Sequence, residues 1–186
     1  MFKKVAQFFG NRAGAESVAI TAVMIAVTSV ATLLVRVPVP ATSGYFNFCD
    51  VLVYFAAFAF GPWIGLIAGG VGPALADLLG GYGAFAPLTF LAHGLQGFVA
   101  GWLGRKWGLT GLLLGWAAGT LAMLGIYYVG EATLYGYGWK GALAEILPNL
   151  GQNVGGALIG IPLFYAVRKA YPPILRLGKP RSWQEN

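Results

Sequence analysis

Most of the chain consists of long uncharged stretches separated by short polar or charged segments. Residues 17–35, 51–76, 78–104, 107–130 and 146–167 contain no Asp, Glu, Lys or Arg. At about 1.5 Å of rise per residue, each stretch is long enough as a helix to cross roughly 30 Å of hydrocarbon. The pattern therefore predicts an all-α integral membrane protein.

The placement of basic residues requires one more crossing than these five stretches supply. Five crossings would put Lys3 and Lys4 on the opposite side of the membrane from Arg168 and Lys169, although basic residues near spans collect in the cytoplasm. The stretch 51–76 contains Phe-Gly-Pro-Trp at 60–63, a sequence at which one helix ends and another begins. Splitting it there predicts a six-transmembrane-helix bundle, with spans near 16–35, 48–60, 62–79, 85–104, 108–130 and 142–168.

This arrangement places every Lys and Arg except Arg36 and Lys140 on the inside, with both termini cytoplasmic. A re-entrant hairpin over residues 48–79, entered from outside, satisfies the same parity and remains an alternative. Residues 1–186 are expected to form a single membrane domain.

The composition supports a membrane protein and excludes several other classes. Of the residues, 58% are hydrophobic and 10% charged, against roughly a quarter charged in soluble domains. The net charge of +6 lies at the ends of apolar runs, which indicates topology rather than nucleic-acid binding. Cys49 is the only cysteine and cannot form an internal disulfide. No further Cys or His stands at ligand spacing, so no metal and no cofactor is expected.

Small residues recur at every fourth position in several predicted helices, as at Gly65 and Gly69 or Gly97 and Gly101. This spacing places them on one helix face and allows close packing against a neighbouring helix. The first span carries a similar row of small residues, which forms a smooth face for docking another membrane protein: Ala15, Ala19, Ala22 and Ala26.

Several motifs in the first half of the chain occur together in one known family. They are Pro-x-Pro at 38–40, Gly-Tyr at 44–45 with Asp50, Phe-Gly-Pro at 60–62, Ala-Asp-Leu-Leu at 76–79 and His-Gly-Leu-Gln-Gly at 93–97. With this order and spacing, residues 19–104 resemble the S components of energy-coupling-factor (ECF) vitamin importers, in particular the riboflavin-transporter-like family. Cys49 is a departure, because the family usually has Gly before the Asp.

The resemblance implies a fold, a function and partners. It implies a six-helix, non-catalytic subunit that binds a B-vitamin-like small molecule on the outer side of a prokaryotic plasma membrane. The loop 36–48 would act as a lid over the pocket. Small residues of the first helix would contact a transmembrane coupling subunit, which is joined to two ATPase subunits.

Polar side chains in the predicted spans are candidates for the binding site, because an unpaired polar group is costly in a membrane. Glu145, Asn149, Gln152 and Asn153 can share one helix face, either as a pocket wall or as an interhelical network with Thr89 or Tyr127. The predicted substrate-binding residues are Tyr45, Asn47, Tyr82, His93, Gln96, Glu131, Glu145, Asn149, Gln152 and Asn153.

The individual candidates leave alternatives open. His93 lies near the expected floor of an outward-facing cup, where it could contact a ligand or only complete a hydrogen-bond network. Asp50 and Asp77 lie at predicted helix ends and are assigned chiefly to capping. Glu131 is surrounded by aromatic residues, which suits either interface anchoring or stacking on a flat, partly cationic ligand.

Two other functions compete with a binding subunit. A small membrane enzyme could use Asp50, Asp77, His93 and Glu145, but these residues form no recognisable catalytic spacing. A solitary secondary carrier would normally show inverted repeats in a longer chain. The sequence has no Gly-x-x-x-x-Gly-Lys-Ser/Thr phosphate loop, so import driven by ATP would need partner subunits.

Overall fold

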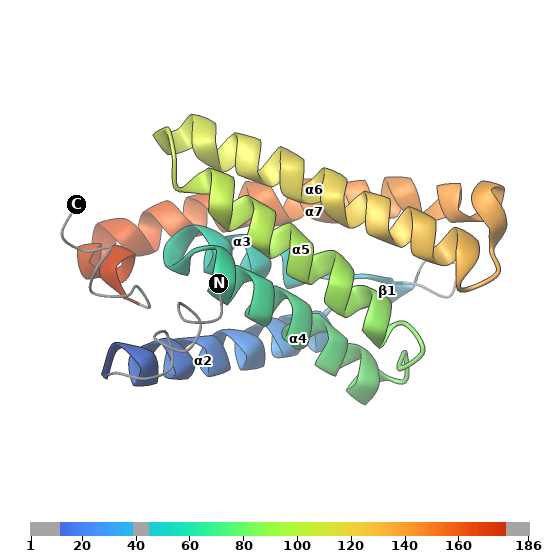
Figure 1. Ribbon diagram of the computed structural model, residues 1–186, viewed down its shortest axis with the longest axis horizontal. Coiled ribbons are helices and arrows are strands. Elements are labelled where there is room, and N and C mark those ends of the chain that lie inside the picture. The colour runs from blue at the N-terminus through green and yellow to red at the C-terminus, as the bar shows by residue number, and fades with distance from the viewer. Residues whose placement is uncertain (1–11, 39–44, 178–186) are drawn as a thin grey trace.

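The protein is a bundle of long helices with a short β-hairpin at one end (Figure 1). The computed structural model describes residues 12–38 and 45–177. Its elements are α2 (Arg12–Leu34), β1 (Val37–Pro38), β2 (Tyr45–Phe46), α3 (Cys49–Phe60), α4 (Pro62–Gly80), α5 (Ala86–Gly104), α6 (Gly108–Thr133), α7 (Gly138–Ala170) and the 3-10 helix η1 (Pro172–Arg176).

The predicted break at the Gly-Pro sequence is present and separates α3 from α4. Gly61 has φ of 95°, which favours glycine, and its N–H donates to the carbonyl of Ala57 at 2.9 Å. Pro62 then begins α4, where its missing N–H is tolerated. A Cβ on Gly61 would lie 2.8 Å from the guanidinium carbon of Arg105, so the break lies beside the α5–α6 turn.

The helices correspond closely to the predicted spans, although α2, α4, α6 and α7 are longer than predicted. α6 continues to Thr133 and α7 begins at Gly138, whereas the sequence indicated 130 and 142. Within residues 12–38 and 45–177, four helical segments are long and apolar enough to cross a membrane: Gly14–Leu34, Pro62–Gly80, Gly108–Thr133 and Gly138–Ala170. Cys49–Phe60 is a shorter apolar helix.

Close glycine contacts hold α4 against α5. A Cβ on Gly97 would lie 2.3 Å from the carbonyl oxygen of Gly65, and one on Gly65 would lie 2.6 Å from that of Gly97. No larger residue fits at either position without moving a backbone. The predicted use of small residues for packing within the bundle therefore holds for this pair.

The two ends of the bundle differ in character. The start of α2, the α3–α4 break, the α5–α6 turn and η1 lie at one end, on the left in Figure 1. Aromatic and aliphatic side chains, among them Phe58, Ile64 and Phe164, form the hydrophobic core of the bundle. The hairpin, the α4–α5 connection and the α6–α7 connection lie at the opposite end (Figure 1). The polar groups described next gather there.

The first helix presents different residues to its two sides. Ser17, Thr21, Met24, Thr28 and Thr32 are buried, and Ser29 Oγ donates to the carbonyl of Gly72 on α4 at 2.8 Å. The row predicted for docking lies on the other side, and each of its four residues is exposed: Ala15, Ala19, Ala22 and Ala26.

The predicted lid, 36–48, is only partly described, because residues 39–44 lie outside the described ranges. Val37 pairs with Phe46 and Pro38 with Tyr45 in an antiparallel hairpin. The extended path expected from the prolines is therefore seen at both ends of the lid.

Candidate functional site

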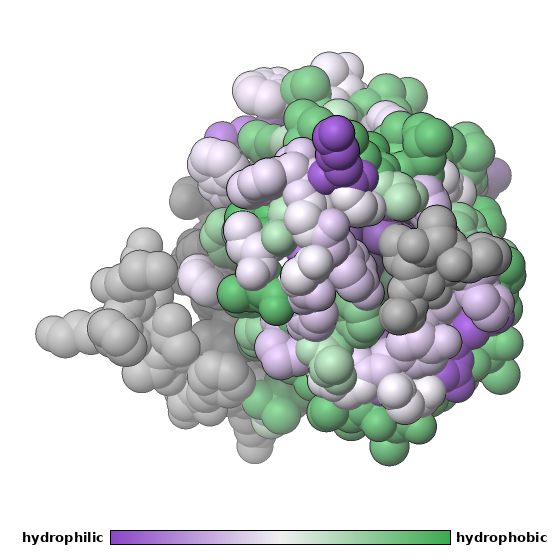
Figure 2. All heavy atoms as spheres, turned by 90° about the vertical axis from the view of Figure 1, so that its right-hand side faces the viewer, coloured by the Kyte–Doolittle hydropathy of each residue, from purple (hydrophilic) through white to green (hydrophobic). Residues whose placement is uncertain are grey.

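A polar cavity opens at the end of the bundle that carries the hairpin. It encloses about 490 Å³ of empty space, including the part open to solvent, and every long helix except α3 contributes to its lining. Figure 2 looks onto this end, where hydrophilic and intermediate residues spread over the centre and hydrophobic residues surround them. The lining residues are Thr32, Tyr45, Asn47, Pro73, Asp77, Tyr82, Phe85, Thr89, His93, Tyr127, Glu131, Glu145, Asn149 and Gln152.

The structure brings most of the sequence-predicted site residues to this one cavity. Those in its lining are Tyr45, Asn47, Tyr82, His93, Glu131, Glu145, Asn149 and Gln152. Gln96 and Asn153 are not in the lining; both are fully buried. Their contacts lie within the bundle, which corresponds to the interhelical alternative.

Asp50 lies beneath the cavity and binds side chains from two other helices. It accepts hydrogen bonds from Gln96 Nε2 at 2.8 Å and from Gln152 Nε2 at 2.9 Å, and His93 Nδ1 lies 3.2 Å from its Oδ1. The carboxylate of Asp50 therefore does more than the helix capping predicted for it. Asp50 lies in the first turn of α3, but its carboxylate joins α3 to α5 and α7.

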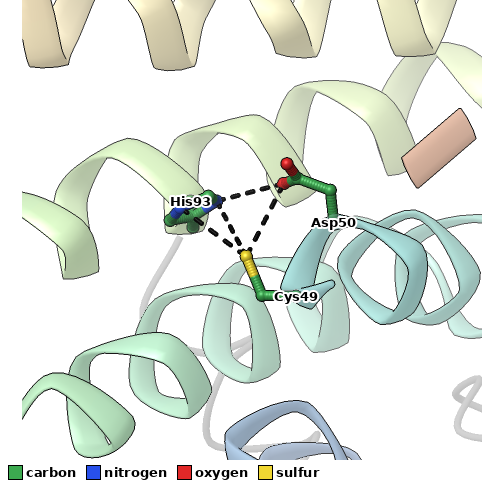
Figure 3. Close-up of side chains that lie close together, drawn as sticks. All are labelled: Cys49, Asp50 and His93. Atoms are coloured by element: carbon green, nitrogen blue, oxygen red, sulfur yellow. Dashed lines mark hydrogen bonds and ion pairs between the residues drawn. The ribbon is translucent and has the colours of Figure 1, made fainter. Parts of the chain in front are cut away.

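Cys49, Asp50 and His93 point toward one another (Figure 3). The atoms that could bind a metal, one from each side chain, all lie within 4.8 Å of one another. The sequence did not indicate this cluster, because His93 comes from a helix 44 residues further on. Cys49 Sγ lies 3.8 Å from both ring nitrogens of His93. In a tetrahedral metal site, the sulfur would lie much closer to the coordinating nitrogen than to the other one. The geometry fits a hydrogen-bonded cluster better than a metal site.

A second layer of polar groups lies deeper and connects four helices. Asn153 Oδ1 accepts from Tyr54 Oη at 2.5 Å, from Gln96 Nε2 at 2.7 Å and from Thr120 Oγ1 at 3.1 Å. The Asn153 amide nitrogen donates to the carbonyl of Asn149 at 2.9 Å. This network supports the cavity floor by fixing α3, α5, α6 and α7 relative to one another.

The described residues of the predicted lid are hydrogen-bonded to two helices. Tyr45 Oη donates to Asp77 Oδ1 of α4 at 2.5 Å, and the backbone N–H of Asn47 donates to Gln152 Oε1 of α7 at 2.8 Å. The Tyr45 ring also lies 4.6 Å from that of Tyr82. Burial, followed by the hydrogen bond to Asp77, raises the pKa of Tyr45, so its hydroxyl stays a donor. Asp77 thus binds Tyr45 of the predicted lid, a contact beyond the capping predicted for it.

The aromatic residues near Glu131 divide into different roles. Tyr127 lines the cavity and donates to Thr89 Oγ1 at 3.0 Å. Tyr135 stacks on Phe85 with ring centroids 4.8 Å apart and donates to the carbonyl of Ala84 at 2.6 Å. Trp139 is exposed. Only part of this aromatic group is thus placed to touch a ligand.

Some lining residues were missed by the sequence analysis. Thr32 could have been found, because it continues a row of Ser and Thr residues on one face of an otherwise apolar helix (Ser17, Thr21, Thr28). Phe85 and Pro73 carry no such signal, since aromatic residues and prolines are common at helix ends and in membrane helices.

The chain is similar to known transporter proteins. Residues 13–169 match the family model described as ECF-type riboflavin transporter, S component, which extends beyond the resemblance over 19–104. The thiamine precursor transporter HmpT of Lactococcus lactis subsp. cremoris (strain MG1363) is 31% identical over 139 residues, which make up 74% of this chain and 79% of HmpT. A Pyrococcus woesei protein, described as an uncharacterized protein in the gap 3′ region, is 42% identical over 148 residues, 79% of this chain and 98% of that protein.

A solved structure supports the fold independently. It is described as the S component of a bacterial ECF transporter and has a TM-score of 0.69 to this chain. The alignment covers 84% of this chain and 97% of the solved one at 21% sequence identity. At that identity the likeness concerns the fold alone.

Proposed function

Because the chain belongs to the family of ECF-type riboflavin transporter S components, which are non-catalytic, substrate-binding subunits of multi-pass membrane transporters, we propose that it captures a vitamin-like small molecule from outside the cell. It then delivers this molecule through a transmembrane coupling subunit joined to two ATPase subunits. The family contradicts the membrane-enzyme hypothesis.

The lidded polar cavity is the observation that carries this proposal. Tyr45, Tyr82, Phe85 and Tyr127 supply aromatic surface, while Asn47, Asn149 and Gln152 supply amide groups. A flat nitrogen heterocycle with polar edges suits such a lining, because its faces stack and its edges hydrogen-bond. The substrate class proposed is therefore a heteroaromatic vitamin or vitamin precursor.

The orientation proposed places the cavity outside and both termini in the cytoplasm. Arg105 and Lys106 lie in the α5–α6 turn, and Arg168 and Lys169 lie near the end of α7, at the end opposite the hairpin (Figure 1). The positive-inside rule then assigns that end to the cytoplasm. Residues 1–11 and 178–186, which carry further basic residues, lie outside the described ranges. With α3 and α4 each crossing, the chain forms one six-span membrane domain.

The docking surface proposed for the coupling subunit is the exposed alanine row on α2. Ala15, Ala19, Ala22 and Ala26 leave a smooth surface there, and small residues allow a partner helix to approach closely in lipid. The buried side of α2 is occupied within the bundle and is unavailable to a partner.

Reconstitution tests the proposal directly. The purified protein should bind its substrate, identified by mass spectrometry of the small molecule that co-purifies with it, without ATP. Proteoliposomes should accumulate that substrate only when the coupling subunit and both ATPases are present with ATP. Uptake by this protein alone would contradict the proposal and favour the solitary carrier.

A further inference from the structure

Two buried carboxylates in the cavity lining each have one oxygen without a hydrogen-bond partner among the described residues. Glu131, in the last turn of α6, is 4% exposed, and Glu145 of α7 is 5% exposed. Both line the cavity. Within residues 12–38 and 45–177, Glu131 Oε2 and Glu145 Oε1 have no hydrogen-bond partner. These are the only buried carboxylate oxygens in those ranges left in this state.

Within residues 12–38 and 45–177, no basic side chain forms an ion pair with Glu131 or Glu145. His93 is paired with Asp50, and Arg36 is directed at the carbonyls of Leu33 and Gly80. Residues 39–44, Val-Pro-Ala-Thr-Ser-Gly, include no Lys, Arg or His.

This arrangement is costly for the empty protein. A buried carboxylate is stable when it is paired or hydrogen-bonded, and Glu131 also stands near a helix C-terminus, where the dipole disfavours negative charge. An unpaired polar group in a cavity can be satisfied by a hydrogen bond to a bound ligand. For carboxylate oxygens, the ligand group must donate hydrogen bonds, carry positive charge, or both.

Resting on the substrate-binding function proposed above, we infer that Glu131 and Glu145 form an acid pair that selects an amino-substituted, protonatable nitrogen heterocycle. Its N–H groups donate to Glu131 Oε2 and Glu145 Oε1, while its ring lies among the aromatic residues of the cavity. An aminopyrimidine has these properties. A ring edge made of carbonyl acceptors, as in a flavin, would face the acid pair unfavourably.

Two probes of nearly equal shape test this selection on the purified wild-type protein in nanodiscs. They are 4-amino-2,5-dimethylpyrimidine and 2,4,5-trimethylpyrimidine, which differ by an amino group in place of a methyl group. Isothermal titration calorimetry should show at least tenfold tighter binding of the amino compound. Equal binding of the two probes, or tight riboflavin binding with neither probe bound, would overturn the inference.

Glu131→Gln and Glu145→Gln test the residues themselves. Each should reduce the preference for the amino probe at least tenfold and should leave the melting temperature of the ligand-free protein unchanged or higher, because an uncompensated charge is removed. A lower melting temperature with unchanged preference would mean that the acids are only structural. Glu16→Gln, on the exposed side of α2, is the matched control and should leave both measurements unchanged.

The two proposals can fail separately. If the amino probe binds selectively but substrate enters proteoliposomes without the ATPases, the acid pair stands and the importer function does not. If uptake depends on the ATPases but the preference survives both Gln substitutions, the importer function stands and the acid pair does not.

Discussion

Asp50 shows how one side chain can organise the floor of the cavity. Its two oxygens bind Gln96 of α5 and Gln152 of α7, and Gln152 in turn accepts the N–H of Asn47 at the end of the lid. A single chain of hydrogen bonds therefore links the buried start of α3 to the cavity wall and to the lid. Networks of this kind hold their members in one arrangement.

Tyr45→Phe should weaken closure of the lid. The substitution removes the bond to Asp77 but keeps the ring, and hydrogen bonds to charged groups contribute roughly 1.5–3 kcal/mol. Release of the co-purifying ligand, measured by stopped-flow fluorescence, should become about tenfold faster or more. Tyr171→Phe, at an exposed position at the other end of the bundle, is the control and should release ligand at the wild-type rate.

The same bond sets an expectation for pH. The pKa of Tyr45 is raised in the folded protein. The stabilisation from its hydrogen bond to Asp77 is therefore fully present below the ordinary tyrosine pKa of about 10. It is lost only as the pH rises through the pKa that Tyr45 has in the folded protein. The difference in release rate between wild type and Tyr45→Phe should therefore stay constant between about pH 6 and pH 9. A difference that disappears within this range would contradict the assigned bond.

The sequence predicted the polar residues of the last span better than it predicted their directions. Asn149, Gln152 and Asn153 could be placed at one depth from their spacing alone. Adjacent residues on a helix are rotated by about 100°, so Gln152 lines the cavity while Asn153 turns into the bundle. Which of the two faces the cavity depends on how α7 is rotated against α3, and that rotation is set by packing rather than by the local pattern.

At the scale of the elements, the contact between α4 and α5 leaves no room for a larger residue at Gly97. Gly97→Ala should destabilise the protein by about 1–3 kcal/mol, because the new methyl group must displace the Gly65 backbone. Gly125→Ala is the matched control: its Cβ would meet nothing within 4 Å, and alanine favours a helix by up to about 1 kcal/mol. Thermal unfolding in detergent should give a lower midpoint for Gly97→Ala, whereas Gly125→Ala should unfold at or above the wild-type midpoint.

The helices themselves could be predicted from hydropathy, charge and the Gly-Pro sequence, because each of these signals is local. The importance of α3 could not. It has only 12 residues, yet it contacts α2, α4, α5 and α7 and carries Asp50 and Tyr54. Its close approach to α7 depends on Gly156, where a Cβ would lie 2.4 Å from that of Asp50. Contacts between residues this far apart in sequence have no local signature.

At the scale of the whole molecule, the proposed docking surface makes a prediction about assembly. Ala22→Trp or Ala26→Trp should prevent co-purification with the coupling subunit, because an indole replaces a smooth surface, and should leave ligand binding unchanged. The Leu121→Trp variant is the control and should assemble normally. Leu121 is 70% exposed on α6, and α6 lies on the far side of the bundle from α2 (Figure 1). Normal assembly of both alanine variants would place the docking surface elsewhere.

Under the proposed function, the two sides of α2 have a mechanical consequence for transport. Thr32 of this helix lines the cavity, while the alanine row of the same helix faces outward. The single helix α2 would then contact the substrate on one side and the coupling subunit on the other. A tilt of α2 that follows loading would reach the coupling subunit without any relay of intervening side chains, so the partner could distinguish a loaded from an empty subunit by the angle of a single helix.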